Sequence, residues 1–282
     1  MNTPESKLRV APTSALVLSY VRELYQDGLS GKYMRHIDLS AVQELVTAVD
    51  QVSTQLGPII QLRKKMVRYL IKQFINRYPR QQVCIIAAGL DPLGLTLAED
   101  YPMLVTGIYE VDQAWMQEKK GIYRKIASHL PLPVTIQADI TNTIQLIRQL
   151  RDAGYDASLP TLIIFEGIIH YISEEQFRDI MQCFTTRNGR NTVIMDYLLV
   201  EEEIASLRFR KMAAGMVAVA EKALNVDLHR YSRKKILNIL ELLNAEVYNI
   251  YDMQAAEYIM QGQNQLYHKP GDGVLEMAAF HL

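Results

Sequence analysis

A short stretch of small and acidic residues, Gln82–Asp112, has the features of a nucleoside-binding site. The apolar run Val83–Ile86 predicts a buried strand, and the turn Ala87–Asp91 follows it directly. Small residues allow the backbone of such a turn to lie against a ligand. The next predicted strand has Glu110 and Asp112 at its end, and an acid in that place can accept hydrogen bonds from both hydroxyls of a ribose.

The turn itself, Ala87-Ala88-Gly89-Leu90-Asp91, argues against a ligand that carries phosphates. It is neither G-x-G-x-x-G nor a glycine-rich loop that ends in Gly-Lys-Ser/Thr. Asp91 would also repel a pyrophosphate. A ligand with a ribose, no phosphate and a cationic centre suits the turn better, which favours S-adenosylmethionine as the cofactor. The alternative is a tight strand-to-helix turn that binds no ligand.

Two further features flank this stretch in the chain. Arg63 precedes the first strand, and its planar guanidinium can hold an α-carboxylate through two hydrogen bonds; an ordinary surface arginine is the alternative. Asp139 and Ile140 end the predicted strand 133–138, where the acid can meet an adenine amino group. Asp139 or Thr141 could instead cap the helix that begins there.

An acid and a histidine follow the fourth predicted strand. Glu166 comes directly after a buried apolar run, so its carboxylate needs a partner or a role. We expect it to face the sulfonium and amino group of the cofactor, or else to form a salt bridge with an N-terminal helix. His170 and Tyr171 are the candidate catalytic residues. His170 could act as a general base, and a core or surface histidine is the alternative.

Seven predicted strands alternate with helices after an all-helical start. Continuous apolar runs such as Leu162–Phe165 are typical of strands buried on both faces. The strands are expected near 82–87, 103–110, 133–138, 161–166, 192–198, 244–251 and 274–282, and the helices near 13–25, 39–56, 58–78, 92–100, 113–129, 141–153, 173–185, 201–225 and 232–243. Residues 255–272 are expected to be a loop.

This order predicts an α/β fold with a seven-stranded, mostly parallel, doubly wound sheet, N-terminal helices and a helical cap. A ligand should bind outside the carboxyl ends of the strands, at the topological switch point. We expect one domain over residues 1–282. Its parts are an N-terminal helical part (1–80), a cofactor-binding core (81–200), a helical cap insertion (201–230) and a C-terminal helix with the last strands (231–282).

Composition narrows the functional classes. Thirty basic residues against thirty-one acidic ones leave no excess to neutralise phosphates, so nucleic acid is not an expected partner. The basic cluster Arg63–Lys65 with Arg68 is expected on a solvated helix face. Cys84 and Cys183 lie in apolar surroundings and indicate a reducing, cytoplasmic compartment. No metal site, signal peptide or membrane-spanning run is predicted.

Four short motifs, in this order, resemble those of the leucine carboxyl methyltransferase family of S-adenosylmethionine-dependent O-methyltransferases. The family motifs are L-G-A-G-L/M-D-T, E-V-D, an acidic-hydrophobic pair and E-G-x-x-x-Y-L. This chain has the counterparts Ala87–Pro92, Glu110–Asp112, Asp139–Ile140 and Glu166–Ile172. Arg63 best matches an upstream family arginine, and Lys119 or Lys120 matches a family lysine on the next helix. The resemblance covers residues 63–172 well and the remainder in outline.

The resemblance implies a class I, Rossmann-like methyltransferase. Arg63 would hold the methionine carboxylate, Asp112 the ribose hydroxyls and Glu166 the methionine moiety. The implied cofactor-binding residues are Arg63, Ala87, Gly89, Asp91, Glu110, Asp112, Asp139, Ile140 and Glu166. Two positions depart from the family. Its first glycine is Ala87 here, which brings a methyl group close to the cofactor, and its threonine after Asp91 is Pro92.

The resulting hypothesis is an O-methyltransferase that acts on a small-molecule or carrier-bound acceptor, a metabolite carboxylate or hydroxyl. A carboxylate acceptor is already ionised and needs no base, whereas a hydroxyl would need one. A homodimer is left open as the assembly. One rival is an enzyme that uses the bound cofactor's charge for a cyclisation or elimination, which formation of S-adenosylhomocysteine would exclude. The other is a cofactor-binding protein without activity.

Overall fold

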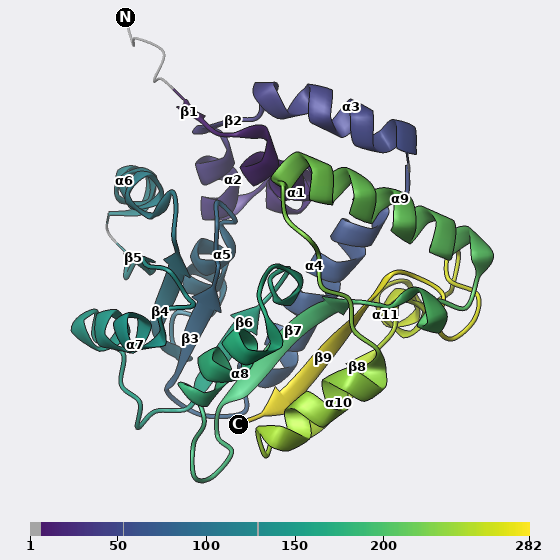
Figure 1. The fold of residues 1–282 in the computed structure, drawn as a ribbon. Helices are drawn as coiled ribbons and strands as arrows, with labels where there is room; N and C mark the ends of the chain where they lie inside the picture. The colour runs from purple at the N-terminus through teal and green to yellow at the C-terminus, as the bar shows by residue number, and fades with distance from the viewer. Residues whose placement is uncertain (1–6, 53, 129) are drawn as a thin grey trace, which may run out of the picture.

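A seven-stranded sheet forms the centre of the protein in a computed structural model that describes residues 7–52, 54–128 and 130–282 (Figure 1). The strands are β3 (Gln81–Ile86), β4 (Val105–Asp112), β5 (Val134–Gln137), β6 (Thr161–Phe165), β7 (Thr192–Leu198), β8 (Glu246–Tyr251) and β9 (Leu275–His281). Their spatial order is β5-β4-β3-β6-β7-β9-β8. β9 runs antiparallel to both β7 and β8, and the other neighbouring pairs are parallel.

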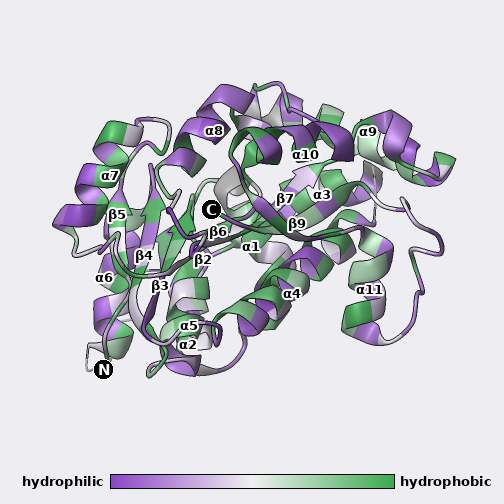
Figure 2. Ribbon diagram, turned by 90° about the horizontal axis from the view of Figure 1, so that it is seen from below, coloured by the Kyte–Doolittle hydropathy of each residue, from purple (hydrophilic) through white to green (hydrophobic). Residues whose placement is uncertain are grey.

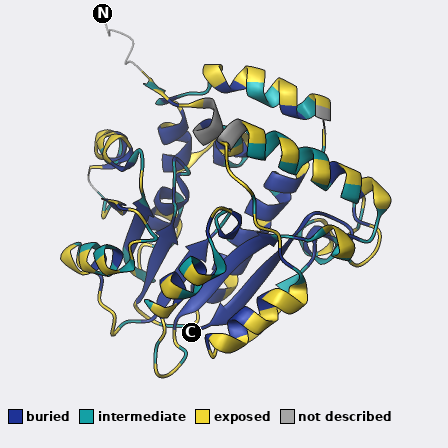
Figure 3. Ribbon diagram, in the orientation of Figure 1, coloured by how far each residue is buried: buried dark blue, intermediate teal, exposed yellow. Residues whose placement is uncertain are grey.

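The chain order reverses at the middle of this sheet. After β3 the chain adds β4 and β5 on one side, and it then returns to place β6 on the other side of β3. A crevice opens at such a point because the connections that follow the two central strands diverge. The apolar runs of β3 and β6 are buried along their whole length, so these two strands form the rigid floor of the crevice (Figure 3).

Helices cover both faces of the sheet (Figure 2). One face carries α4 (Leu56–Phe74), α5 (Leu93–Asp100), α6 (Met116–Ala127) and α11 (Met253–Gln261). The other carries α7 (Thr143–Asp152), α8 (Glu174–Gln182) and α10 (Arg233–Leu242). Side-chain caps fix where several of these helices begin. Asn142, Ser232 and Asp252 accept from backbone amides of α7, α10 and α11, and Ser173 and Gln176 form a reciprocal capping box on α8.

The N-terminal part packs against α4, α5 and α6. It consists of β1 (Leu8–Arg9), α1 (Pro12–Val21), the 3₁₀ turn Arg22–Tyr25, α2 (Gly28–Met34), β2 (Ile37–Asp38), the 3₁₀ turn Ser40–Val42 and α3 (Gln43–Val52). Its apolar side chains form a second core that includes Leu95 of α5 and Tyr123 of α6. This second core holds α1 and α3 beside the crevice.

Helix α9 (Leu207–Leu224) follows the short 3₁₀ turn Glu201–Glu203 and lies next to α3 (Figure 1). It ends at Asn225, whose positive φ of 53° is the left-handed conformation that commonly terminates helices. Together α1, α3 and α9 lie over the carboxyl ends of the central strands. Within the described part of the chain, no helix has the length and apolar character needed to cross a membrane.

The predicted α/β architecture and all seven predicted strands are confirmed. The loop expected over residues 255–272 is partly wrong, because α11 occupies its beginning, between the cap Asp252 and Gly262 with its positive φ of 74°. β1, β2 and α2 were not predicted. β8 and β9 pair as antiparallel strands, as expected, but α11 separates them in the chain. Residues 53 and 129, inside two predicted helices, lie outside the described residues.

Candidate functional site

Two adjoining cavities open at the switch point. The larger has a volume of 520 Å³ and the smaller one of 200 Å³. Val17, Ala87, Ile168 and Tyr171 line both, so the cavities meet at these side chains. A volume of this order is typical of small-molecule sites.

The turn after β3 forms the boundary between the cavities. Ala87 has a φ of 54° and Gly89 a φ of 48°, so both residues adopt the left-handed conformation. A Cβ on Gly89 would meet no atom within 4 Å, which means that open space faces this backbone. Ala87 holds the same kind of conformation with a Cβ, which costs about 1–2 kcal/mol. The turn is therefore shaped to let a ligand approach the backbone, and it carries strain at Ala87.

A buried lysine supports this turn from below. Lys119 of α6 donates to the carbonyl oxygens of Gly89, at 3.0 Å, and Asp91, at 2.7 Å. Its Nζ also lies 3.1 Å from Glu110 Oε1. Of the two lysines that match the family position, Lys119 is thus the one that contacts the turn. It is fully buried and uses its three N–H groups on three partners.

Glu110 lies beneath the turn and not in either cavity. Its Oε1 also accepts from the Gly94 amide, at 3.2 Å, and from the Tyr123 hydroxyl, at 3.1 Å. Burial raises the pKa of Glu110, although Lys119 opposes the shift. Glu110 and Asp112 point to the same side of β4, but Glu110 sits about 6.6 Å deeper along the strand. The structure therefore does not place Glu110 where the sequence analysis expected it, in contact with a ligand.

Asp112 and the residues after β5 line the larger cavity. Asp112 Oδ2 accepts from the Gly89 amide at 2.9 Å, and Oδ1 accepts from the Ala114 amide at 3.0 Å. Each oxygen keeps acceptor capacity for a ligand. Asp139 and Ile140 line the same cavity, and Asp139 Oδ1 accepts from both the amide and the hydroxyl of Thr141. The cap of α7 is Asn142, so neither Asp139 nor Thr141 is needed for that purpose.

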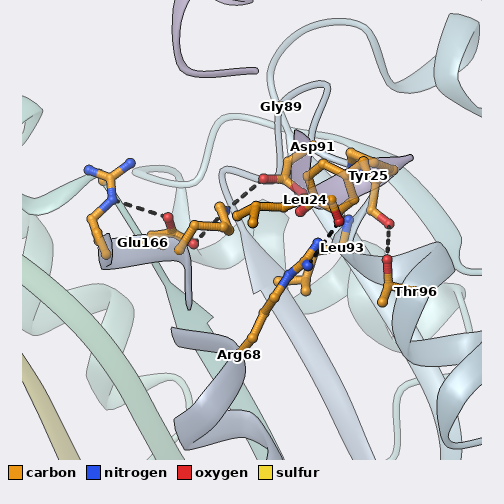
Figure 4. A network of polar contacts seen from close by, with 12 residues as sticks. Leu24, Tyr25, Arg68, Gly89, Asp91, Leu93, Thr96 and Glu166 are labelled. Carbon is orange, nitrogen blue, oxygen red and sulfur yellow. Dashed lines mark hydrogen bonds and ion pairs between the residues drawn. The ribbon is translucent and has the colours of Figure 1, made fainter. Parts of the chain in front are cut away.

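A cluster of charged side chains lies at the smaller cavity (Figure 4). Lys64 Nζ lies 2.6 Å from Asp91 Oδ2 and 2.6 Å from Glu166 Oε2. Arg63 Nε lies 3.1 Å from Glu166 Oε1, and its Nη1 lies 3.4 Å from Asp196 Oδ2. Each of the two cations therefore bridges two carboxylates.

The charges of this cluster do not cancel. Two cations face three carboxylates, which leaves one formal negative charge. Burial opposes ionisation of Asp91, but the Lys64 ammonium and hydrogen bonds from Lys64 and Tyr25 outweigh it and lower the pKa of this carboxyl. Figure 4 shows Tyr25 beside Asp91. Asp196 is fully buried against Arg63, whereas Asp91 and Glu166 line the smaller cavity, where their carboxylates favour a cationic ligand.

The two candidate catalytic residues differ in their surroundings. Tyr171 is 43% exposed and lines both cavities. His170 is only 6% exposed and is not among the described residues that line either one. Burial, together with the charge of Arg63, lowers the pKa of His170 to about 3. His170 is therefore neutral near pH 7 and a weak proton acceptor.

Lys64 and Asp196 are site residues that the sequence analysis missed. The sequence predicts the Arg63–Lys65 cluster on a solvated helix face, but Arg63 and Lys64 are both buried. Both follow Ile60 and precede Val67 at helical spacing, which is a detectable sign of the buried face. Asp196 interrupts an apolar strand, and a buried acid in such a place needs a partner. It accepts from the Gly167 amide at 2.6 Å and holds Arg63.

Comparisons with known proteins agree with this geometry. Residues 19–185 match the sequence pattern of the leucine carboxyl methyltransferase family. A candidate S-adenosylmethionine-dependent methyltransferase of Mycolicibacterium vanbaalenii is 29% identical over 154 residues, which cover 52% of this chain and 47% of that protein. The chain spans about half the length of the curated relatives that it matches.

Two solved structures share the fold. One is a candidate methyltransferase of Thermobifida fusca YX, with a TM-score of 0.67, 12% identity and coverage of 98% of this chain and 96% of that one. The other is a DUF574 family protein of Streptomyces avermitilis, with a TM-score of 0.61, 14% identity and coverage of 86% and 90%.

Among the described residues, no group of three or more His, Cys, Asp or Glu side chains could hold a metal ion.

Replacing Lys119 by Met should lower the free energy of unfolding by about 3–5 kcal/mol, because it leaves Glu110 and two carbonyl groups buried without their partner. The matched control is Lys120→Met, which should change it by less than about 0.5 kcal/mol. Urea denaturation measures both values. The double variant Lys119→Met/Glu110→Gln should recover part of the loss. Equal free energies of unfolding for Lys119→Met and Lys120→Met would contradict the supporting role of Lys119.

Replacing Ala87 by Gly should raise the free energy of unfolding by about 0.5–1 kcal/mol, because relief of the left-handed strain exceeds the entropic cost of glycine. Ala88→Gly is the control. Ala88 is buried next door without a positive φ, so this change should destabilise the protein. Thermal and urea unfolding of the pair give the answer, and a loss of stability in both variants would mean that Ala87 is unstrained.

Proposed function

The chain belongs to the leucine carboxyl methyltransferase family, and we propose on this basis that it transfers a methyl group from S-adenosylmethionine to an oxygen atom of a small or carrier-bound acceptor. S-adenosylmethionine is the cofactor of this family. The observation that carries the proposal is the pair of joined cavities. One has carboxylates at the strand ends, and the other has a charged cluster with one excess negative charge.

The residues present fit this cofactor. Asp112 would accept from the ribose hydroxyls, and Asp139 and Ile140 would hold the adenine in the larger cavity. The open space in front of Gly89 leaves room for the chain that joins the nucleoside to the sulfonium. This fit needs no movement of the turn, because Lys119 already fixes it.

The charged cluster suits the methionine end. Glu166 and Asp91 would attract the ammonium and the sulfonium, and Arg63 has guanidinium N–H groups left for the carboxylate. A Cβ on Gly167 would lie 3.3 Å from Arg63 Nη2, so the glycine keeps this side of the guanidinium open. Lys64 would hold Asp91 and Glu166 in the same positions whether or not the cofactor is bound.

When bound, S-adenosylmethionine supplies an activated methyl carbon. In the proposed reaction an acceptor oxygen forms a bond to this carbon while the bond from sulfur to carbon breaks, and S-adenosylhomocysteine leaves as a neutral thioether. The protein's part is to align the oxygen with the methyl group and exclude water. Val17, Ile168 and Tyr171, which line the junction of the two cavities, are the side chains that we infer to shape this approach.

We infer that the acceptor oxygen arrives already ionised. A hydroxyl would need a general base. The candidate His170 is buried with a pKa of about 3, and burial raises the pKa of the other candidate, Tyr171, which therefore keeps its proton near pH 7. A carboxylate has no proton to remove near neutral pH. The geometry therefore favours a carboxylate, or another oxygen acid of similar strength, over an unactivated hydroxyl.

Asp112→Asn should weaken binding of S-adenosylmethionine by about 1.5–3 kcal/mol, because charged hydrogen bonds to the ribose are lost. Isothermal titration calorimetry with the cofactor measures this change. The control is Asp156→Asn, an exposed turn residue away from both cavities, which should bind like the wild type. The same titration tests the proposed function, since a wild-type protein that fails to bind the cofactor would overturn it.

His170→Asn should retain kcat within about threefold of the wild type from pH 6 to 8, because an ionised acceptor needs no base. Transfer of a labelled methyl group to an acceptor found by screening organic acids and alcohols is the measurement, after a melting curve has confirmed folding. A fall in kcat of about 10²-fold or more, removed at high pH, would instead show a base-assisted hydroxyl acceptor.

A further inference from the structure

The larger cavity has two chemically different parts. Apart from Tyr171 at the junction of the cavities, its polar side chains lie at or after the ends of β4 and β5; they are Asp112, Gln113, Asp139 and Thr141. The rest of the lining is apolar and comes mainly from helices, including Leu45 and Val49 of α3 and Met216, Val219 and Ala220 of the neighbouring α9. A nucleoside matches the first part, so the second part is left for another ligand.

Apolar surface is uncovered along this helical wall. Beside the wall, Val17 of α1 is 37% exposed and Val226, which follows α9, is 41% exposed, and both line the cavity. Leu45, Met216 and Val219 are only partly buried. An apolar ligand that covers such surface removes it from water, which favours binding. The wall therefore favours a ligand with an extended apolar body.

The charges at the site limit what else that ligand can carry. Among the described residues that line the larger cavity there is no lysine, arginine or histidine, and the only charged ones are Asp112 and Asp139. The cations of the smaller cavity, Arg63 and Lys64, are each held by two carboxylates. A ligand with several negative charges would find no counter-charge, and a peptide would leave its backbone groups without partners on the apolar wall.

We propose that the wall formed by α3 and α9 binds the apolar body of the acceptor, and that the acceptor is an amphiphilic organic acid with a single ionised oxygen. This inference rests on the proposed function, since it names the acceptor of the same site. The ionised oxygen lies toward Tyr171, where the cavities meet, and the sulfonium supplies its counter-charge. Val49, Met216, Val219 and Ala220 are the residues that set the length and width of the apolar body.

The experiment fills the apolar wall without touching the cofactor residues. Ala220→Phe adds a ring on the cavity side of α9, and Ala218→Phe adds the same ring on the exposed side of the same helix. The probe is 4-hexylbenzoate, titrated by calorimetry into protein saturated with S-adenosylhomocysteine. Glutarate and a short peptide that ends in a leucine carboxylate are the comparison ligands. S-adenosylhomocysteine is titrated separately into every variant.

The wild type and Ala218→Phe should bind 4-hexylbenzoate alike and should bind neither comparison ligand measurably. Ala220→Phe should weaken 4-hexylbenzoate by about tenfold or more. It should leave S-adenosylhomocysteine binding unchanged. Equal affinity of Ala220→Phe and Ala218→Phe for the probe, or tighter binding of glutarate or the peptide, would overturn the inference. Failure of the wild-type protein to bind S-adenosylhomocysteine would overturn the proposed function instead.

A second variant guards against misfolding of Ala220→Phe. Val219→Asp places a negative charge on the same wall and should repel the probe, again by about tenfold or more. Its control is Ala218→Asp on the exposed side. If Val219→Asp binds 4-hexylbenzoate like its control, the probe does not use this wall and the inference is wrong.

Discussion

The burial of one ammonium group, that of Lys119, is the interaction on which the site depends. A buried charge is stable only when each of its hydrogens has a partner, and here Glu110 and the carbonyls of Gly89 and Asp91 supply them. These partners come from β4 and from the turn after β3, while the lysine comes from α6. The requirement to satisfy one charge therefore fixes the position of the turn relative to two strands and a helix.

A second set of ion pairs connects this turn to other strands of the sheet and to a helix. Asp91, at the end of the fixed turn, holds Lys64, which also holds Glu166. Glu166 and Asp196 then hold Arg63. The contacts join the turn after β3 to α4, to the end of β6 and to β7. Helix α4 is thus tied to the carboxyl edge of the sheet by charges that also form a wall of the smaller cavity, so positioning and ligand attraction use the same groups.

The sequence predicted the fold well because its signals are local. Apolar runs such as 162–165 define strands whatever their neighbours are, and their alternation with helices determines the switch point. Site residues at strand ends, such as Asp112 and Asp139, follow from that position. Lys64 and Glu110 could not be placed in the same way, because their burial depends on partners that are distant in the sequence or on depth along a strand. A run of consecutive basic residues suggests a solvated surface, because the acids that pair with them are distant in the sequence.

An apolar wall beside a charged cluster is consistent with the chemistry proposed for the site. An anionic oxygen and a cationic sulfonium neutralise each other when the methyl group moves, so water, which stabilises separate charges, opposes the transfer. Surroundings of low polarity stabilise the separate ions less than water does, so they favour the neutral products. The side chains of α3 and α9 would provide such surroundings, while the carboxylates of Asp91 and Glu166 at the smaller cavity would attract the cofactor. A buried, neutral His170 is consistent with this proposal, because a reaction driven by charge neutralisation depends on positioning and on the exclusion of water more than on a base.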